Sequence, residues 1–190
     1  PEIAHKKGLK TVVGAWISND KERNEKEIQS LIKLAEAGLV DIAAVGNEVL
    51  HREEIAEQEL IGYIQRVRAA LPDSIPVGYV DAYYQFLDRP ALVEVCDVIL
   101  ANCYPFWEGA DNNFALNYLN RMIELTQLSS NGKKVIITET GWPSKGENIE
   151  AAVPSRLNAM KYFIALHSIE RELNYLNRMI ELTQLSSNGK

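Results

Sequence analysis

Short apolar segments alternate with amphipathic segments along most of the chain. Five runs rich in β-branched residues are typical of strands that are buried on both faces: residues 11–17, 40–45, 76–80, 97–102 and 134–138. Between them apolar residues recur at spacings of three and four, which predicts helices: 20–37, 53–71, a short one near 90–93, 114–128 and 154–170. The pattern therefore predicts roughly five strands, each followed by a helix.

This alternation predicts an α/β fold with a parallel sheet, which is either a doubly wound open sheet or a (β/α)8 barrel of the TIM type. Three of the predicted strands end in polar or aromatic residues, within Gly46–Glu48, Asn102–Trp107 and Thr138–Pro143. Reactive groups at the carboxyl ends of several strands are typical of the barrel. No glycine-rich phosphate-binding loop follows the first predicted strand, which weakens the dinucleotide-binding alternative. The barrel is favoured.

Composition narrows the possible partners. The chain has 190 residues, of which 46% are hydrophobic and 24% charged, as in an average soluble domain. Its net charge is -6 and it has no basic cluster, so we do not expect nucleic acid as a partner. The chain contains no run of 18 apolar residues, so the sequence predicts no membrane span. The histidines and the cysteines, Cys96 and Cys103, are dispersed, so we expect neither a metal site nor a disulfide.

Two glutamates, Glu48 and Glu139, each follow an apolar predicted strand. Strand alternation places Glu48 on one face with Ala44 and Gly46, and Glu139 on one face with Ile137, so both can point into one barrel mouth. Alone, Glu48 would be interpreted as a solvated glutamate at a helix start. Two carboxyls that face one cleft, one protonated and one ionised, are the minimum needed to cleave a glycosidic bond. Their joint placement favours the catalytic interpretation.

Polar and aromatic residues near these glutamates predict a sugar-binding cleft. Asn47 and Asn102 could hydrogen-bond sugar hydroxyls. Flat faces for sugar rings would come from the aromatic residues near the strand ends: Tyr79, Tyr104, Phe106, Trp107, Trp142 and Trp16. Taken singly, an aromatic residue at the start of a loop more often caps the core, and this alternative stays open for each of them.

Two segments closely resemble the signatures of glycoside hydrolase family 17, which comprises β-1,3-glucanases and related glucanosyltransferases: Val45–Leu50 and Ile137–Ser144. Trp16–Ser18 and Asn102–Phe106 are similar to further family segments, and the resemblance runs from about Gly8 to about Ile169. The resemblance implies a (β/α)8 barrel with retaining chemistry. It makes Glu48, at the end of the fourth strand, the acid/base and Glu139, at the end of the seventh, the nucleophile.

The same resemblance implies that the barrel is incomplete. If Glu48 ends the fourth strand and Glu139 the seventh, the chain supplies strands three to seven of eight. The two open edges of such a sheet would invite a second copy to pair with them, so a homo-oligomer is a possible state. Family members are often secreted or associated with the cell wall, but no targeting segment in this chain indicates a location.

Two functions follow. The first is a retaining glycoside hydrolase or transglycosylase that acts on β-1,3-linked glucan by double displacement. It would need no cofactor, because the two carboxyls supply both the proton and the nucleophile. The alternative is a catalytically inactive piece, either a truncated or recombined barrel fragment or a carbohydrate-binding remnant. An opened cleft would hold the protonated acid poorly at neutral pH.

One segment is an identical repeat. Residues 116–133 recur without a single change at 173–190. A diverged repeat protein would show drift and more than two copies, so the pair indicates a recent duplication, a chimeric origin or an assembly artefact. We therefore divide the chain into a partial (β/α) barrel catalytic domain, 1–172, and a duplicated helical segment, 173–190. We expect Leu173–Leu185 to be helical and to cover the strand edge next to Glu139, or a partner chain.

Overall fold

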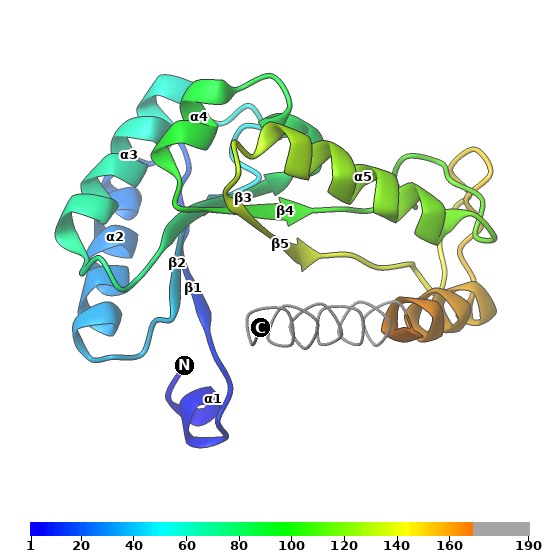
Figure 1. The fold of residues 1–190 in the computed structure, drawn as a ribbon, viewed down its shortest axis with the longest axis horizontal. Helices are drawn as coiled ribbons and strands as arrows, with labels where there is room; N and C mark the ends of the chain where they lie inside the picture. The colour runs from blue at the N-terminus through cyan, green and yellow to red at the C-terminus, as the bar shows by residue number, and fades with distance from the viewer. Residues whose placement is uncertain (169–190) are drawn as a thin grey trace, which may run out of the picture. The chain divides into compact units, whose positions relative to one another are not determined.

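The computed structural model describes residues 1–168, and its elements follow the predicted alternation (Figure 1). The strands are β1 (Val12–Ala15), β2 (Ile42–Asn47), β3 (Val77–Ala82), β4 (Val98–Asn102) and β5 (Lys134–Glu139). The helices are α1 (Glu2–Lys6), α2 (Lys21–Glu36), α3 (Glu57–Ala70), α4 (Pro90–Val95) and α5 (Ala115–Ser129), with a 3-10 turn η1 (Tyr83–Phe86) and a further helix over 156–168. The predictions for Leu173–Leu185 and for a boundary at residue 172 lie outside the described residues.

The chain divides into two compact units. The first contains Pro1–Cys103 and Arg121–Glu139 and therefore holds the whole sheet. The second contains Tyr104–Asn120 and the chain from Thr140 onward. Within residues 1–168 no helix has both the length and the apolar character needed to cross a membrane. Cys96 is a buried free thiol, and Cys103 is also buried.

The order of the strands distinguishes the two predicted architectures. The strands are hydrogen-bonded in sequence order, from β1 to β5, and every neighbouring pair is parallel. A doubly wound sheet would instead reverse its strand order at a switch point. Helices α2, α3 and α4 lie side by side along the sheet (Figure 1). The prediction of a parallel barrel that is incomplete is confirmed, with five strands in the described residues against the eight of a full barrel.

Local sequence explains most element boundaries. The carboxylate of Asp20 caps α2 by accepting a hydrogen bond from the Arg23 N–H at 3.0 Å. Helix α3 begins at Glu57, four residues later than the predicted residue 53, because the chain first makes a tight loop in which Glu53 has a φ of 55°. The apolar spacing predicts an inward face for each helix. In α3 all four residues of that face are buried: Leu60, Ile61, Ile64 and Val67. In α2 Ile28, Leu31 and Ala35 are buried, whereas Ile32 is only partly buried.

The face of the sheet that would form the barrel interior carries a small apolar cluster. Its buried members are Ala44, Val80, Val98 and Leu100, with Ile42 and Ile136 packed against them. Residues between these positions, such as Tyr79 on β3, point to the opposite face, which the helices cover. Continued toward the carboxyl ends of the strands, the interior face leads to the polar residues of the candidate site.

Candidate active site

A tight turn at the end of β2 places Glu48. Gly46 has a φ of 85°, and a Cβ atom there would lie 2.8 Å from a methyl carbon of Val49, so only glycine fits without a shift of neighbouring atoms. Glu48 itself has a φ of 54°, an uncommon conformation for a glutamate that costs about 1–2 kcal/mol. Its backbone N–H donates to the carbonyl of Val80 at 2.8 Å, which ties the turn to β3.

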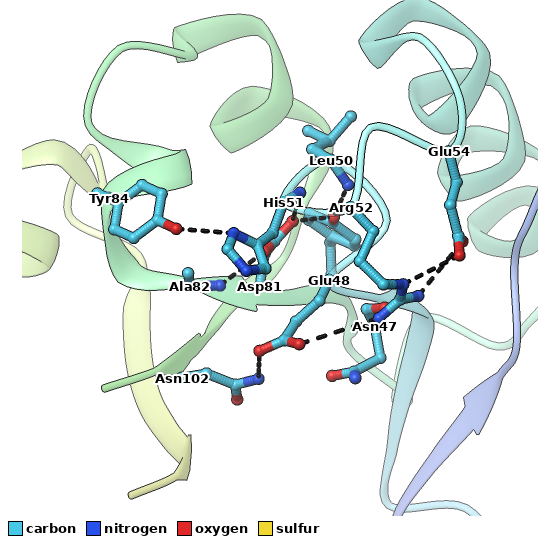
Figure 2. A network of polar contacts seen from close by, with 11 residues as sticks. Asn47, Glu48, Leu50, His51, Arg52, Glu54, Asp81, Ala82, Tyr84 and Asn102 are labelled. Atoms are coloured by element: carbon cyan, nitrogen blue, oxygen red, sulfur yellow. Dashed lines mark hydrogen bonds and ion pairs between the residues drawn. The ribbon is translucent and has the colours of Figure 1, made fainter. Parts of the chain in front are cut away.

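The Glu48 carboxylate has two polar neighbours (Figure 2). The side-chain amide of Asn102, at the end of β4, donates to Glu48 Oε1 at 3.0 Å. Arg52 Nη1 lies 3.9 Å from Glu48 Oε2. The Glu48 side chain is 28% exposed, so its carboxylate stays within reach of a ligand while Asn102 holds one oxygen.

Asn102 joins the strands that carry the two glutamates. It is only 2% exposed, and its Oδ1 accepts a hydrogen bond from Thr138 Oγ1 of β5 at 2.7 Å. Since the hydroxyl donates to Oδ1, the NH2 group of the amide must face Glu48, which leaves one consistent amide orientation. The chain of bonds from Glu48 through Asn102 to Thr138 therefore links β2, β4 and β5 at one edge of the sheet.

Glu139 reaches this edge through a register shift. Ala101 of β4 pairs with Ile137, but the next residue, Asn102, pairs with Glu139, so Thr138 is an extra residue on β5. Simple alternation, which groups Glu139 with Ile137, does not account for its position, because Ile136 is the β5 residue that packs on the interior cluster. The shift brings Glu139 into register with Asn102 on the interior face, and the Cys103 N–H donates to the Glu139 carbonyl at 2.8 Å.

The other glutamate-bearing strand has the same irregularity. Ala44 of β2 pairs with Gly78 of β3, whereas Asn47 pairs with Val80, so β2 also carries one extra residue just before its glutamate. Extra residues of this kind bend a strand locally and re-aim its side chains. Each predicted carboxyl therefore follows a bulge at the carboxyl end of its strand.

A cavity of about 620 Å³ opens on the interior face of the first unit. It is lined by residues of β1, β2, β3 and β5, so the sheet curls until its two outermost described strands face the same space. Asn47, Thr138 and Glu139 supply polar groups, and Trp16, which is 43% exposed, supplies an accessible ring. Among residues 1–168, no group of three or more His, Cys, Asp or Glu side chains is placed to hold a metal ion.

Tyr79 does not present a ring to this cavity, which corrects the predicted sugar-binding role. It is completely buried and its hydroxyl donates to the carboxylate of Asp81, which is also fully buried. The hydroxyl accepts a hydrogen bond from the Leu50 N–H at 2.9 Å, and Asp81 Oδ2 accepts one from the His51 N–H at 3.3 Å. Tyr79 and Asp81 thus hold the loop that follows Glu48.

Burial raises the pKa of the Asp81 carboxyl. Hydrogen bonds from Tyr79 and from the backbone N–H groups of Ala82 and His51 oppose this shift, and the nearby negative charge of Glu48 adds to it. Asp81 is not among the site residues that the sequence predicted. The signal available was an aspartate at the end of a strand that is otherwise apolar, a position where a buried carboxyl needs dedicated donors.

The remaining predicted residues belong to the second unit, where two of them form core. Phe106 is 3% exposed and Trp142 8% exposed, and their rings meet edge to face with centroids 5.3 Å apart. The Trp142 indole N–H donates to the carbonyl of Val153 at 3.0 Å. Both side chains expose too little of their rings to pack against a sugar. Trp107, 64% exposed, presents an accessible ring, and Tyr104 is partly exposed.

Known proteins match this chain over most of its length. The BtgE/BtgC glycoside hydrolase domain matches residues 1–182. A glucan 1,3-beta-glucosidase of Candida albicans is 25% identical over 177 residues, which cover 82% of this chain and 57% of that protein. The crystal structure of a glycoside hydrolase family 17 beta-1,3-glucanosyltransferase from Rhizomucor miehei superposes with a TM-score of 0.77 and 32% identity, and covers 85% of this chain and 61% of that one.

An active-site mutant of the same Rhizomucor miehei enzyme, in complex with laminaritriose, matches with the same TM-score, identity and coverage. The chain thus spans somewhat more than half the length of these relatives. The resemblance to glycoside hydrolase family 17 is confirmed by the agreement of sequence and fold. The family match over residues 1–182 agrees with the strand order and with the two glutamates at strand ends. The chain therefore belongs to the family of BtgE/BtgC glycoside hydrolase domains.

Proposed function

We propose that this protein is a retaining glycoside hydrolase or transglycosylase acting on β-1,3-linked glucan. The observation that carries the proposal is the position of Asn102, which donates to Glu48 and stands in register with Glu139. Two carboxyl groups are thereby arranged around one residue at the carboxyl ends of parallel strands, where barrel enzymes hold their catalytic groups. The names of the relatives, a glucan 1,3-beta-glucosidase and an enzyme complexed with laminaritriose, support glucan as the substrate class.

In the proposed mechanism Glu48 protonates the oxygen of the leaving sugar while Glu139 attacks the anomeric carbon and forms a glycosyl-enzyme ester. Glu48 then takes a proton from water, or from the hydroxyl of an acceptor sugar, which displaces Glu139 with the anomeric configuration retained. Retention requires the two carboxyl groups to lie about 5–5.5 Å apart. Within the first unit, Asn47 and Trp16 are proposed to contact the sugar rings. Tyr104 and Trp107 of the second unit stay predicted sugar-binding residues.

The test is the turnover of laminarin and laminaritriose. We expect reducing sugar or longer oligosaccharides to appear, with the β anomer formed first in proton NMR. Glu139→Gln and Glu48→Gln should each lower kcat by on the order of 10³-fold or more. Glu36→Gln, which changes an exposed glutamate at the end of α2, is the matched control and should leave kcat unchanged. First formation of the α anomer would contradict the retaining mechanism.

A second candidate function is glucan binding without turnover. It is favoured by the open sheet, because in the described residues β1 and β5 each pair with one neighbour only. A cleft open to water raises the local dielectric and weakens the environment that keeps one carboxyl protonated beside an ionised one. Binding of laminaritriose measured by calorimetry, with no product after prolonged incubation, would support this function over the enzyme.

The same two strand edges underlie a proposal about assembly. In the described part of the chain β1 and β5 are the outermost strands of the sheet, and such strands are templates for pairing with another chain, so we propose that copies associate through these edges. Light scattering after size-exclusion chromatography should give a mass that is a multiple of that of one chain. A strictly monomeric mass at every protein concentration would contradict the proposal.

A further inference from the structure

Arg52 lies in the loop that follows β2, close to the candidate acid/base Glu48. Its Nη2 donates to the carbonyl of Asn47 at 2.7 Å, and its Nε donates to Glu54 Oε1 at 3.0 Å (Figure 2). A second bond, from Nη2 to Glu54 Oε2 at 3.3 Å, makes the contact with Glu54 two-pronged. Between Arg52 and Glu48, in contrast, the structure has a single contact of 3.9 Å. The guanidinium is therefore engaged mainly by Glu54 and faces Glu48 from a distance.

The same guanidinium also contacts the accessible ring of Trp16, the residue that follows β1. The Arg52 carbon Cζ lies 5.1 Å from the centroid of the Trp16 ring, a cation–π contact, and the Trp16 backbone N–H donates to Glu27 Oε2 at 3.1 Å. The Arg52 side chain is 31% exposed. One side chain thus connects the end of β1 with the end of β2, and fixes Trp16 relative to Glu48.

The carboxylate of Glu54 limits how strongly Arg52 interacts with Glu48. The hydrogen bond from Arg52 to Glu54 is the largest cause of the raised pKa of Arg52, and the charges of Glu54 and Glu48 add to it. The positive charge favours the ionised form of a neighbouring carboxyl. A full bidentate pair with Glu48 would oppose the protonated form that an acid catalyst needs. Glu54 competes for the same donors and limits that engagement.

We propose that Arg52, anchored by Glu54, is a positioning residue that orients the carboxyl of Glu48 and the ring of Trp16 for the reaction on glucan. This inference rests on the proposed function of Glu48 as the acid/base. Two other groups interact with Glu48: Asp81 from β3, through its charge, and the neutral amide of Asn102 from β4. Glu139 of β5 stands in register with Asn102. Because these stay unchanged in the variants below, differences between the variants isolate Arg52 and Glu54.

The experiment measures the titration of Glu48 directly, by 13C NMR of protein labelled at the glutamate side-chain carboxyls. The Glu48 signal is assigned by its absence in Glu48→Gln. In Arg52→Met the midpoint of this signal should rise by about half a pH unit, since a positive charge in a partly exposed pair is lost. In Glu54→Gln it should fall by a similar amount, because Arg52 is released to pair with Glu48. A purely structural role would not produce shifts of opposite sign.

Two further variants keep the test decisive. Arg66→Met, which breaks an exposed pair with Glu25 on α2 and α3, is the control and should leave the Glu48 midpoint unchanged. Arg52→Lys retains the charge without the planar fork, so it should keep the midpoint and lower kcat/KM on laminarin. If Arg52→Met does not fold, Arg52→Gln replaces it, because it also removes the positive charge and should raise the Glu48 midpoint in the same direction.

The outcomes separate this inference from the proposed function. Opposite shifts of the Glu48 midpoint in the Arg52 and Glu54 variants support the role of Arg52, whether or not laminarin is turned over. Shifts of the same sign, or shifts no larger than that of Arg66→Met, overturn it even if laminarin is cleaved. Absence of turnover in the wild-type protein would instead count against the proposed function.

Discussion

Replacing Asn102 by alanine should weaken the junction between β2, β4 and β5. The change removes the donor to Glu48 at 3.0 Å and the acceptor for Thr138 at 2.7 Å, and it leaves the Thr138 hydroxyl without that partner. A hydrogen bond to a charged group contributes about 1.5–3 kcal/mol and a neutral one about 1 kcal/mol. Because the Glu48 side chain is 28% exposed, solvent screening favours the lower end of the first range.

The expected loss is therefore about 2–3 kcal/mol, a large part of the stability of a typical domain. For a chain of this size it corresponds to a fall in Tm of roughly 4–12 °C. Thermal and urea unfolding followed by circular dichroism measure both quantities. Asn113→Ala, which changes an exposed asparagine, is the matched control and should stay within about 0.5 kcal/mol of the wild type.

The isosteric variant Asn102→Asp provides a check through its pH dependence. It keeps an acceptor for Thr138 but sets a second carboxyl 3.0 Å from Glu48 Oε1. Two adjacent carboxyls retain a proton in the folded state, so stability should be highest at low pH and fall as the pH rises from about 4.5 to 8. An N102A variant as stable as N113A, or an N102D variant more stable at pH 8 than at pH 4.5, would refute the bridging role.

Three further predictions concern the loop after β2 and the repeat. Burial raises the pKa of Asp81, and Tyr79→Phe removes a hydrogen bond that opposes this shift, so the variant should raise the pKa further. Because that bond stabilises the ionised carboxylate, the loss of about 1–3 kcal/mol in unfolding free energy should be larger at pH 8 than at pH 5. An equal loss at both pH values would contradict this role of Tyr79. Gly46→Ala, at a φ of 85°, should lower Tm measurably and reduce turnover, and a neutral result would show that the turn relaxes. Deleting the chain after Glu172 should lower solubility or Tm if the repeat covers a strand edge, whereas a truncated chain of equal stability and solubility would leave the repeat without a structural role.

Periodicity by itself predicted most of the elements and their order, because burial patterns with periods near two and near 3.6 residues are local properties of the sequence. The inward faces of α2 and α3 and all five strands illustrate this. Helix α1, of five residues, is too short to show a period. The late start of α3 was missed because long-range bonds, from Glu48 N–H to Val80 and from Leu50 N–H to Tyr79, decide the preceding loop.

The candidate site could be predicted in part. The placement of Glu48, Glu139 and Asn102 at one edge of the sheet was predictable, because the carboxyl ends of parallel strands meet there. Aromatic residues were assigned less well, since Phe106 and Trp142 pack into the core of the second unit and Tyr79 into that of the first. Residue type alone does not distinguish a ring that binds ligand from a ring that fills the interior.

The sequence by itself determined which residues stand near the ends of the strands, and the tertiary structure decided which of them face one another. The extra residue before Glu139 changes the side of the sheet on which that side chain points, and the extra residue in β2 with the turn at Gly46 re-aims Glu48. A bulge of this kind is defined only by the hydrogen bonds to the neighbouring strand. Those bonds join residues far apart in the chain, and no period within one strand contains them.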